Sequence, residues 1–215
     1  MKVKVVIFDW DGTLVDSVEH IAESLHQAAT ELGFPARERE AYRDIIGLGM
    51  VEALEKLYPG ISRDEMNRIR EGYGRYFFKK VTTPQNVFAG MADVVADIRG
   101  SGRGCSVATG KSRRGLDLAL VSSGLGEHFG ITRCADETRS KPDPTMLEEI
   151  VRFYGIDPSE AVMIGDTRYD LDMAQRLGMP SIGVEWGVHK RDVLGKYAPH
   201  AIVDTVSDLR RVLGL

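Results

Sequence analysis

Short apolar runs alternate with stretches of helical periodicity along most of the chain. The first run, residues 3–8, is apolar and β-branched except for Lys4, which is typical of a strand buried on both faces of a parallel sheet. Similar runs predict strands at 105–108, 131–135, 161–164, 181–184 and 201–203. Helical spacing predicts helices at 91–99, 113–123, 144–154, 169–177 and 206–213. Strands that alternate with helices favour right-handed crossovers, so we expect an α/β, Rossmann-like core of three layers around a parallel sheet.

Residues 17–81 interrupt this alternation, because they carry helical patterns and no strand pattern. Ser62 followed by Glu65 matches a capping box at the start of a helix. Segment 82–86, Thr-Thr-Pro-Gln-Asn, is typical of a linker. Periodicity also predicts helices at 37–46 and 50–58. We therefore expect two parts, an α/β core of residues 1–16 and 82–215 and an inserted helical domain of residues 17–81.

Two carboxylates follow the first predicted strand at once. Asp9 and Asp11 are two positions apart and precede Gly12. In extended backbone such residues point to the same face, and the carboxyl ends of strands are where open α/β sheets bind ligands. Like charges placed together are costly unless a cation or a proton lies between them. Taken alone, the pair favours a functional site only slightly over a turn rich in Asp and Gly.

Three further stretches place polar side chains after predicted strands. They are Thr109-Gly110-Lys111-Ser112, Lys141-Pro142, and Gly165-Asp166-Thr167-Arg168-Tyr169-Asp170. A helix that begins just after Gly110 would direct its free amides at an anion. Alone, Thr109 is equally typical of a cap or turn. An isolated lysine such as Lys141 is normally a solvated surface residue. Carboxylates without a Cys/His cluster suit Mg²⁺ better than zinc.

The string Asp-Trp-Asp-Gly-Thr-Leu-Val-Asp-Ser at 9–17, followed in order by these three stretches, closely resembles the four motifs of the haloacid dehalogenase superfamily. Members of that superfamily are mostly phosphatases that use an aspartate nucleophile and Mg²⁺. The resemblance implies that the helical insertion is the family's small cap. It also implies that the cap selects the leaving group of the substrate.

The resemblance assigns chemical roles to individual residues. It implies that Asp9 is the nucleophile, which forms an aspartyl-phosphate, and that Asp11 is the general acid and then the base that activates water. Thr109 Oγ and the Gly110 N–H would bind the transferring phosphoryl group. Lys141 would neutralise charge on the nucleophile and the phosphoryl oxygens, as cationic clamps do in phosphoryl transfer.

The same resemblance implies a magnesium site and a substrate contact. Asp9, the backbone carbonyl of Asp11 and Asp166 would bind Mg²⁺. Asp170 would belong to the same site by ordering metal-bound water or the lysine of the third motif. Lys111 follows the phosphate-binding turn directly, and we expect it to bind the substrate.

Three alternatives lie within the superfamily. An acid at position 11 disfavours dehalogenation, and Gly165 stands where a β-phosphoglucomutase would carry Glu. A phosphonatase would need a cap lysine, for which Lys56, Lys79 and Lys80 are available. The full string is most similar to the phosphoglycolate phosphatase-like group, so we expect an Mg²⁺-dependent phosphatase acting on a small phosphorylated metabolite. Two further alternatives are not enzymes. They are a receiver-type phospho-acceptor and a non-catalytic protein that binds a phosphorylated ligand.

Composition adds a few constraints on class and location. A hydrophobic content of 43%, a charged content of 28% and a net charge of −4 are ordinary for a globular protein and argue against a general nucleic-acid binder. No apolar run has the length of a membrane span and no signal peptide is evident, so we expect a cytoplasmic protein, monomeric or homodimeric. Cys105 and Cys134 fall in predicted strands, where buried free thiols are expected.

Overall fold

The computed structural model describes residues 3–79 and 86–215. Within this part of the chain the core is a parallel sheet of six strands in the order β3-β2-β1-β4-β5-β6. The strands are β1 (Val5–Phe8), β2 (Gly104–Thr109), β3 (Ile131–Cys134), β4 (Ala161–Gly165), β5 (Ser181–Val184) and β6 (Ala201–Val203). The predicted parallel sheet is therefore confirmed, with strand ends within one or two residues of those expected from periodicity.

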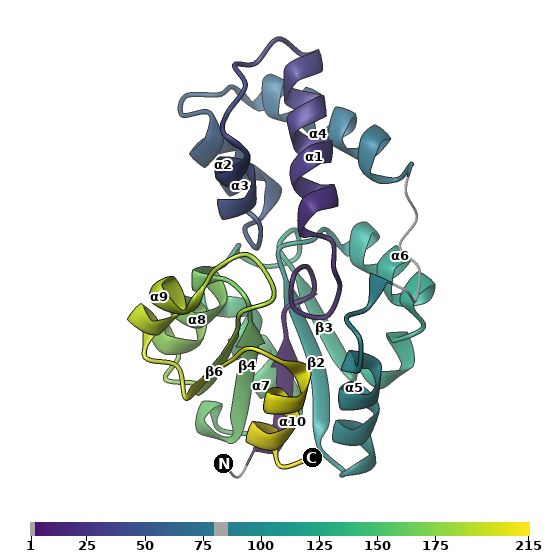
Figure 1. The fold of residues 1–215 in the computed structure, drawn as a ribbon, viewed down its shortest axis with the longest axis vertical. Coiled ribbons are helices and arrows are strands. Elements are labelled where there is room, and N and C mark those ends of the chain that lie inside the picture. Colours follow the sequence, from purple (N-terminus) through teal and green to yellow (C-terminus); the bar gives the residue numbers. More distant parts are fainter. Residues whose placement is uncertain (1–2, 80–85) are drawn as a thin grey trace.

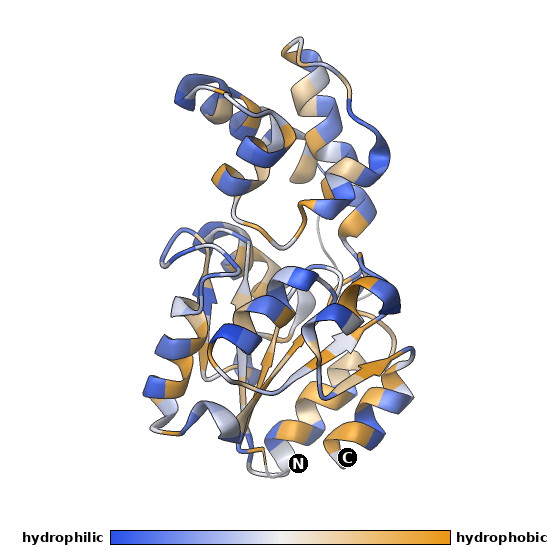
Figure 2. Cartoon of the chain, turned by 90° about the vertical axis from the view of Figure 1, so that its left-hand side faces the viewer, coloured by the Kyte–Doolittle hydropathy of each residue, from blue (hydrophilic) through white to orange (hydrophobic). Residues whose placement is uncertain are grey.

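Helices cover both faces of the sheet, which gives the three layers expected (Figure 1). Alternate side chains of β1 point to opposite faces, so Val6 and Phe8 join one hydrophobic cluster and Val5 and Ile7 join another. The first cluster packs against α5 (Met91–Gly100), α6 (Arg113–Ser123) and α10 (Val206–Leu213). The second packs against α7 (Thr145–Tyr154) and α8 (Arg168–Arg176). Figure 2 shows the same division, with apolar residues along the strands and polar residues on the outer sides of the helices.

The residues before position 80 contribute a separate helical cluster. Its helices are α1 (Val18–Glu31), α2 (Arg39–Asp44), α3 (Met50–Leu57) and α4 (Arg63–Phe77). They bury their own core, which includes Leu25, Leu54 and Ile69. Figure 1 shows the cluster above the sheet, on the side away from both chain ends. The capping box of α4 is confirmed, because Ser62 Oγ accepts from Glu65 N at 3.3 Å and Glu65 Oε2 accepts from Ser62 N at 2.8 Å.

A few element predictions were wrong or fall outside the described residues. The helix expected at 37–46 is only Arg39–Asp44, because the chain turns at Gly47 with a φ of 101°. The short helix α9 (Arg191–Leu194) was not predicted, since four residues are too few to show a helical period. Segment 82–85 of the predicted linker and Lys80 lie outside the described residues.

Both cysteines are buried and free. Burial raises the pKa of each thiol to about 12, so neither is a thiolate near neutral pH. Among the helices that the structure describes, none is both long and apolar enough to cross a bilayer.

Candidate active site

The central strand β1 fixes the position of the site. Phe8, its last residue, is paired with Val107 of β2 and with Ile164 of β4. Asp9 follows directly and its N–H donates to Ile164 O at 2.9 Å. The residues that follow β1, β2 and β4 therefore meet at one edge of the sheet, where the strand order reverses between β1 and β4.

Three buried carboxylates meet at this edge. Oxygen atoms of Asp9, Asp166 and Asp170 lie within 4.8 Å of one another. Asp9 follows β1, Asp166 follows β4, and Asp170 lies in the first turn of α8. Burial, helped by the neighbouring charge of Asp170, raises the pKa of Asp166 to about 6. Burial also raises the pKa of Asp9 well above its usual range, although Lys141 opposes this shift.

Lys141 supplies the positive charge of this cluster. Its ammonium lies 2.6 Å from Asp9 Oδ1 and 2.6 Å from Asp170 Oδ1, and all three side chains are buried. Burial would lower the pKa of Lys141, but the two carboxylates outweigh burial and hold the pKa above its usual range. Lys141 is therefore charged, and it orients one oxygen of each partner.

Asp166 is held by groups on two loops. Thr13 Oγ1 donates to its Oδ1 at 2.8 Å, and the Val188 N–H donates to its Oδ2 at 2.8 Å. Two glycines leave room for the carboxylate, because a Cβ on Gly12 or Gly187 would lie 2.3 Å or 2.1 Å from Asp166 Oδ2. The sequence pattern singled out Asp166 and did not reveal Thr13, whose only distinguishing feature is its place in the first motif.

Asp170 has both oxygens engaged within the protein. Lys141 occupies Oδ1, while the Thr167 N–H and hydroxyl donate to Oδ2 at 3.0 Å and 2.7 Å. This arrangement suits a residue that orients the lysine. Among the oxygens of the three carboxylates, Asp9 Oδ2 is the one without a hydrogen-bond partner.

The cluster fits a divalent cation. Asp9 Oδ2 is buried and, alone among the carboxylate oxygens of the described residues that are this deeply buried, has no hydrogen-bond partner. An unpaired buried oxygen is costly, and two further carboxylates lie beside it. Hard oxygen donors of this kind are the ligands that Mg²⁺ prefers.

Asp11 lies on the same edge and has cationic and neutral partners. Lys111 Nζ is 3.1 Å from both of its oxygens, and the Ser17 hydroxyl donates to Oδ1 at 2.7 Å. The same ammonium lies 4.9 Å from the centre of the Phe77 ring of α4. Lys111, which we expected to bind substrate, is therefore paired with Asp11 at the wall of the site.

The turn after β2 lies directly under the helical cluster. Thr109 is buried at the end of β2, and its hydroxyl accepts from the Lys111 N–H at 3.3 Å. A Cβ on Gly110 would lie 2.5 Å from Leu48 O and 2.6 Å from Gly47 O. Glycine is therefore required at 110 because the 47–48 backbone approaches it so closely.

A second set of contacts joins the helical cluster to the core, and the sequence did not reveal it. Asp44, the last residue of α2, accepts from Lys56 at 2.7 Å and from Arg168 at 2.6 Å. His189 accepts the Arg168 N–H through Nδ1 at 3.1 Å, so its Nε2 carries the proton and donates to Asp44 Oδ1 at 3.0 Å.

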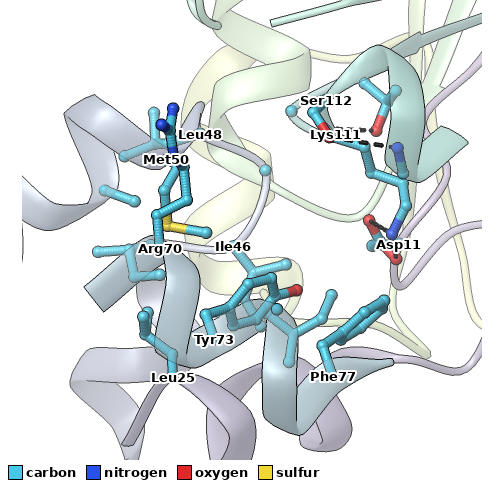
Figure 3. Close-up of a pocket in the computed structure, with 18 of the residues that line it drawn as sticks. Asp11, Leu25, Ile46, Leu48, Met50, Arg70, Tyr73, Phe77, Lys111 and Ser112 are labelled. Atoms are coloured by element: carbon cyan, nitrogen blue, oxygen red, sulfur yellow. Dashed lines mark hydrogen bonds and ion pairs between the residues drawn. The ribbon is translucent and has the colours of Figure 1, made fainter. Parts of the chain in front are cut away.

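A cavity of about 200 Å³ lies between the helical cluster and the carboxylates (Figure 3). Asp9, Asp11, Thr109, Gly110 and Lys111 line its core side. The structure thus brings these residues to one space, with Lys141, Asp166 and Asp170 packed at its base through Asp9. Such an enclosed space with convergent polar groups is typical of a small-molecule site.

Known proteins resemble this chain along almost its whole length. The family model "Haloacid dehalogenase-like hydrolase" matches residues 6–184. A protein named "Probable phosphatase IndB" from Dickeya dadantii (strain 3937) is 35% identical over 210 residues, which are 95% of this chain and 90% of that protein. A "Phosphoglycolate phosphatase" from Photorhabdus laumondii is 28% identical, with 99% of this chain and 93% of that protein covered. The crystal structure of a hydrolase from Pseudomonas syringae has the same fold, with a TM-score of 0.88, 20% identity and 98% of each chain covered.

The family match begins in β1 and ends with β5. It therefore contains the acidic turn, the lysine and every strand that leads into the site. The chain belongs to the haloacid dehalogenase-like hydrolases and is a phosphatase of their phosphoglycolate phosphatase-like group.

Proposed function

We propose that this phosphatase hydrolyses a small phosphomonoester with the help of Mg²⁺, through an aspartyl-phosphate on Asp9. One observation carries the proposal. Lys141 fixes Asp9 Oδ1 at 2.6 Å, whereas the buried Oδ2 has no hydrogen-bond partner beside the cavity. A carboxylate held by one oxygen has the other available for a metal or a phosphorus atom.

The proposed metal ligands are Asp9, the backbone carbonyl of Asp11 and Asp166. Asp170 contributes by orienting Lys141, to which it is bound at 2.6 Å. Bound Mg²⁺ would offset the negative charge of the phosphoryl group and of the carboxylates around it. Thr109, Gly110 and Lys111 would contact the phosphoryl group of the substrate directly.

The reaction would proceed in two displacements at phosphorus. In the first, a carboxylate oxygen of Asp9 attacks phosphorus, the ester P–O bond breaks, and Asp11 gives its proton to the departing oxygen. In the second, water attacks the phosphorus of the aspartyl-phosphate and gives a proton to Asp11. Inorganic phosphate leaves and both aspartates return to their starting forms.

Asp11 must exchange its ionic partner for this cycle to run. In the structure the Lys111 ammonium contacts both oxygens of Asp11, and the Ser17 hydroxyl donates to Oδ1. We infer that an arriving phosphoryl group draws the Lys111 ammonium away and leaves Asp11 able to carry a proton. Thr109 Oγ and the Gly110 N–H would bind the same phosphoryl group at the end of β2.

Residues 17–81 would act as the cap of this site. Their described part supplies the cavity wall opposite Asp9, and closing it excludes water that would compete with the leaving group. The core would be residues 1–16 and 82–215. The 47–48 backbone against Gly110 supports a closed arrangement, because no side chain separates the two parts there.

The position of the cap lysines does not favour a phosphonatase. Lys56 binds Asp44 at 2.7 Å and Tyr169 OH at 2.5 Å, and Lys79 lies over the Tyr76 ring. Neither lines the cavity that contains Asp9. A Schiff-base lysine would have to face that cavity.

The test is hydrolysis of a generic aryl phosphate in the presence of Mg²⁺. Asp9→Asn should abolish turnover, and Asp11→Asn should reduce it severely, while far-UV circular dichroism remains that of the native protein. The matched control is Asp16→Asn, because Asp16 belongs to the same motif and is exposed. Unchanged turnover in Asp9→Asn would contradict the proposal. A phosphorylated protein that persists and releases no phosphate would favour a receiver-type function instead.

A further inference from the structure

The cavity wall contributed by the helical cluster is apolar. Figure 3 shows side chains from three helices and the turn after α2 converging on the space in front of Asp11. The residues that form this apolar wall are Leu25, Ile46, Leu48, Met50, Tyr73 and Phe77. A substrate whose phosphoryl group reaches Asp9 must place its alcohol part against this wall.

The wall offers few partners for a second charged group. Among the described lining residues the only cationic side chains are Lys111 and Arg70. Lys111 is paired with Asp11, next to the place of the phosphoryl group. Arg70 is exposed on α4. A carboxylate on the substrate would therefore have to share Lys111 with the phosphoryl group or bind Arg70 in an exposed ion pair.

Tyr73 does not add charge to the wall. Burial raises the pKa of its hydroxyl well above the usual value, and the nearby charge of Asp11 acts in the same direction. The phenol is therefore neutral at working pH. Its ring stacks on Phe77 with centroids 5.2 Å apart, which gives the wall a flat aromatic surface.

The volume indicates how large a group this wall can bury. A dry apolar cavity of about 150 Å³ holds one benzene molecule, and the space here is about 200 Å³. Part of that space must accept the phosphoryl group. The remainder suits one ring of five or six atoms or a short branched alkyl chain.

We propose that the substrate is a phosphomonoester of an alcohol with a compact apolar body, an aromatic ring or a branched alkyl group, and not of a hydroxy acid or a polyol. This inference rests on the proposed function. Apart from the Tyr73 hydroxyl, the side chains of this wall are hydrocarbon or thioether groups, so most carboxylate or hydroxyl groups buried against it would find no hydrogen-bond partner. Burying an apolar group instead stabilises the bound state in proportion to its area.

The first experiment compares substrates that share one ester linkage. Initial rates with Mg²⁺ are measured for ethyl, propyl, butyl and benzyl phosphate, for glycerol phosphate and for phosphoglycolate. We expect kcat/KM to rise about fourfold for each added methylene, and benzyl phosphate to exceed phosphoglycolate by about tenfold or more. A preference for phosphoglycolate or glycerol phosphate over benzyl phosphate would overturn the inference.

A binding measurement separates this inference from the proposed function. Calorimetry with benzylphosphonate and phosphonoacetate, which have no ester bond to hydrolyse, should give the lower Kd for benzylphosphonate. Tighter binding of benzylphosphonate without turnover of any ester would contradict the phosphatase mechanism and leave the recognition of an apolar group in place. Turnover of the esters together with tighter binding of phosphonoacetate would support the phosphatase mechanism and contradict the recognition of an apolar group.

A pair of variants tests the wall itself. Met50→Gln keeps the side-chain length and makes one wall position polar. It should raise KM for benzyl phosphate about tenfold and change kcat less than about twofold. The KM for ethyl phosphate should be nearly unchanged. Val51→Gln is the matched control, because Val51 is the next residue of α3, is 51% exposed and does not line the cavity. Equal effects of the two variants on benzyl phosphate would contradict the assignment of this wall to the substrate.

Discussion

Asp44 of α2 accepts a hydrogen bond of 3.0 Å from His189, which lies in the loop after β5. This contact joins the helical cluster to the core outside the lining of the cavity, which contains neither Asp44 nor His189. The backbone N–H of His189 donates to Asp166 O at 3.1 Å. One short loop therefore holds both a proposed metal ligand and the helical cluster.

We predict that Asp44→Asn loosens this attachment. Burial would raise the pKa of Asp44, but hydrogen bonds from His189 and Lys56 outweigh it and hold the pKa well below the usual range. Because Asp44 is partly exposed, screening limits its contribution to about 1 kcal/mol of the free energy of unfolding. Urea denaturation of Asp44→Asn should show this loss at pH 7.

The sign of the pH dependence follows from the lowered pKa. The stabilisation is fully present above the unfolded-state pKa of about 3.9 and is lost as pH falls through the folded-state pKa. The difference between the wild type and Asp44→Asn should therefore shrink below about pH 4. Glu55→Gln, an exposed change on α3, should show neither effect. A difference that grows on acidification would contradict this account.

Lys141→Met should be strongly destabilising, because it leaves Asp9 and Asp170 buried without their cation. Breaking a buried ion pair on one side costs about 3–5 kcal/mol. The loss should be smaller at pH 5 than at pH 7, since the raised pKa of Asp9 lets the carboxyl take up a proton. Chemical denaturation at the two pH values measures this. In Lys141→Met, the additional change Asp170→Asn should recover part of the stability, and no recovery would count against the charge argument.

Mg²⁺ should stabilise the folded protein through Asp166. At a concentration of about 100 times Kd the expected gain is about 2.7 kcal/mol, seen as a rise in Tm. The rise should weaken as pH falls through about 6, because the pKa of Asp166 is raised to about 6 and protons then compete with the metal.

Asp166→Asn should lose most of this rise in Tm. Asp172→Asn is the control, because Asp172 lies on α8, six residues after Asp166, and pairs with Arg176. An equal rise in Tm with Mg²⁺ in both variants would exclude Asp166 as a metal ligand.

The sheet could be predicted from the sequence because each strand is a short apolar run between turn residues. It also located the acidic and basic stretches, since carboxyl ends of parallel strands must meet at one edge. The structure places Asp9, Thr109, Lys141 and Asp166 there, although their chemical roles remain proposals. Local sequence patterns were enough to place these residues at the edge because each stretch follows its own strand.

Contacts between distant elements were not predictable in the same way. Asp44 and His189 are 145 positions apart, and no periodicity relates the end of a helix to a loop of the core. Lys111 was expected to face the substrate, and its pairing with Asp11 depends on how the turn after β2 lies against the first motif. The apolar wall likewise forms only when α1, α3 and α4 pack together.

The central claim is that Asp9 becomes phosphorylated during turnover. The direct measurement is to quench the reaction with a phosphomonoester substrate in acid, reduce the protein with borohydride, and identify the modified residue by peptide mass spectrometry. Borohydride reduces an aspartyl-phosphate to homoserine. The account predicts homoserine at position 9 in the wild type and in Asp16→Asn, and none when substrate is omitted. Reduction at another residue, or turnover with position 9 never modified, would contradict it.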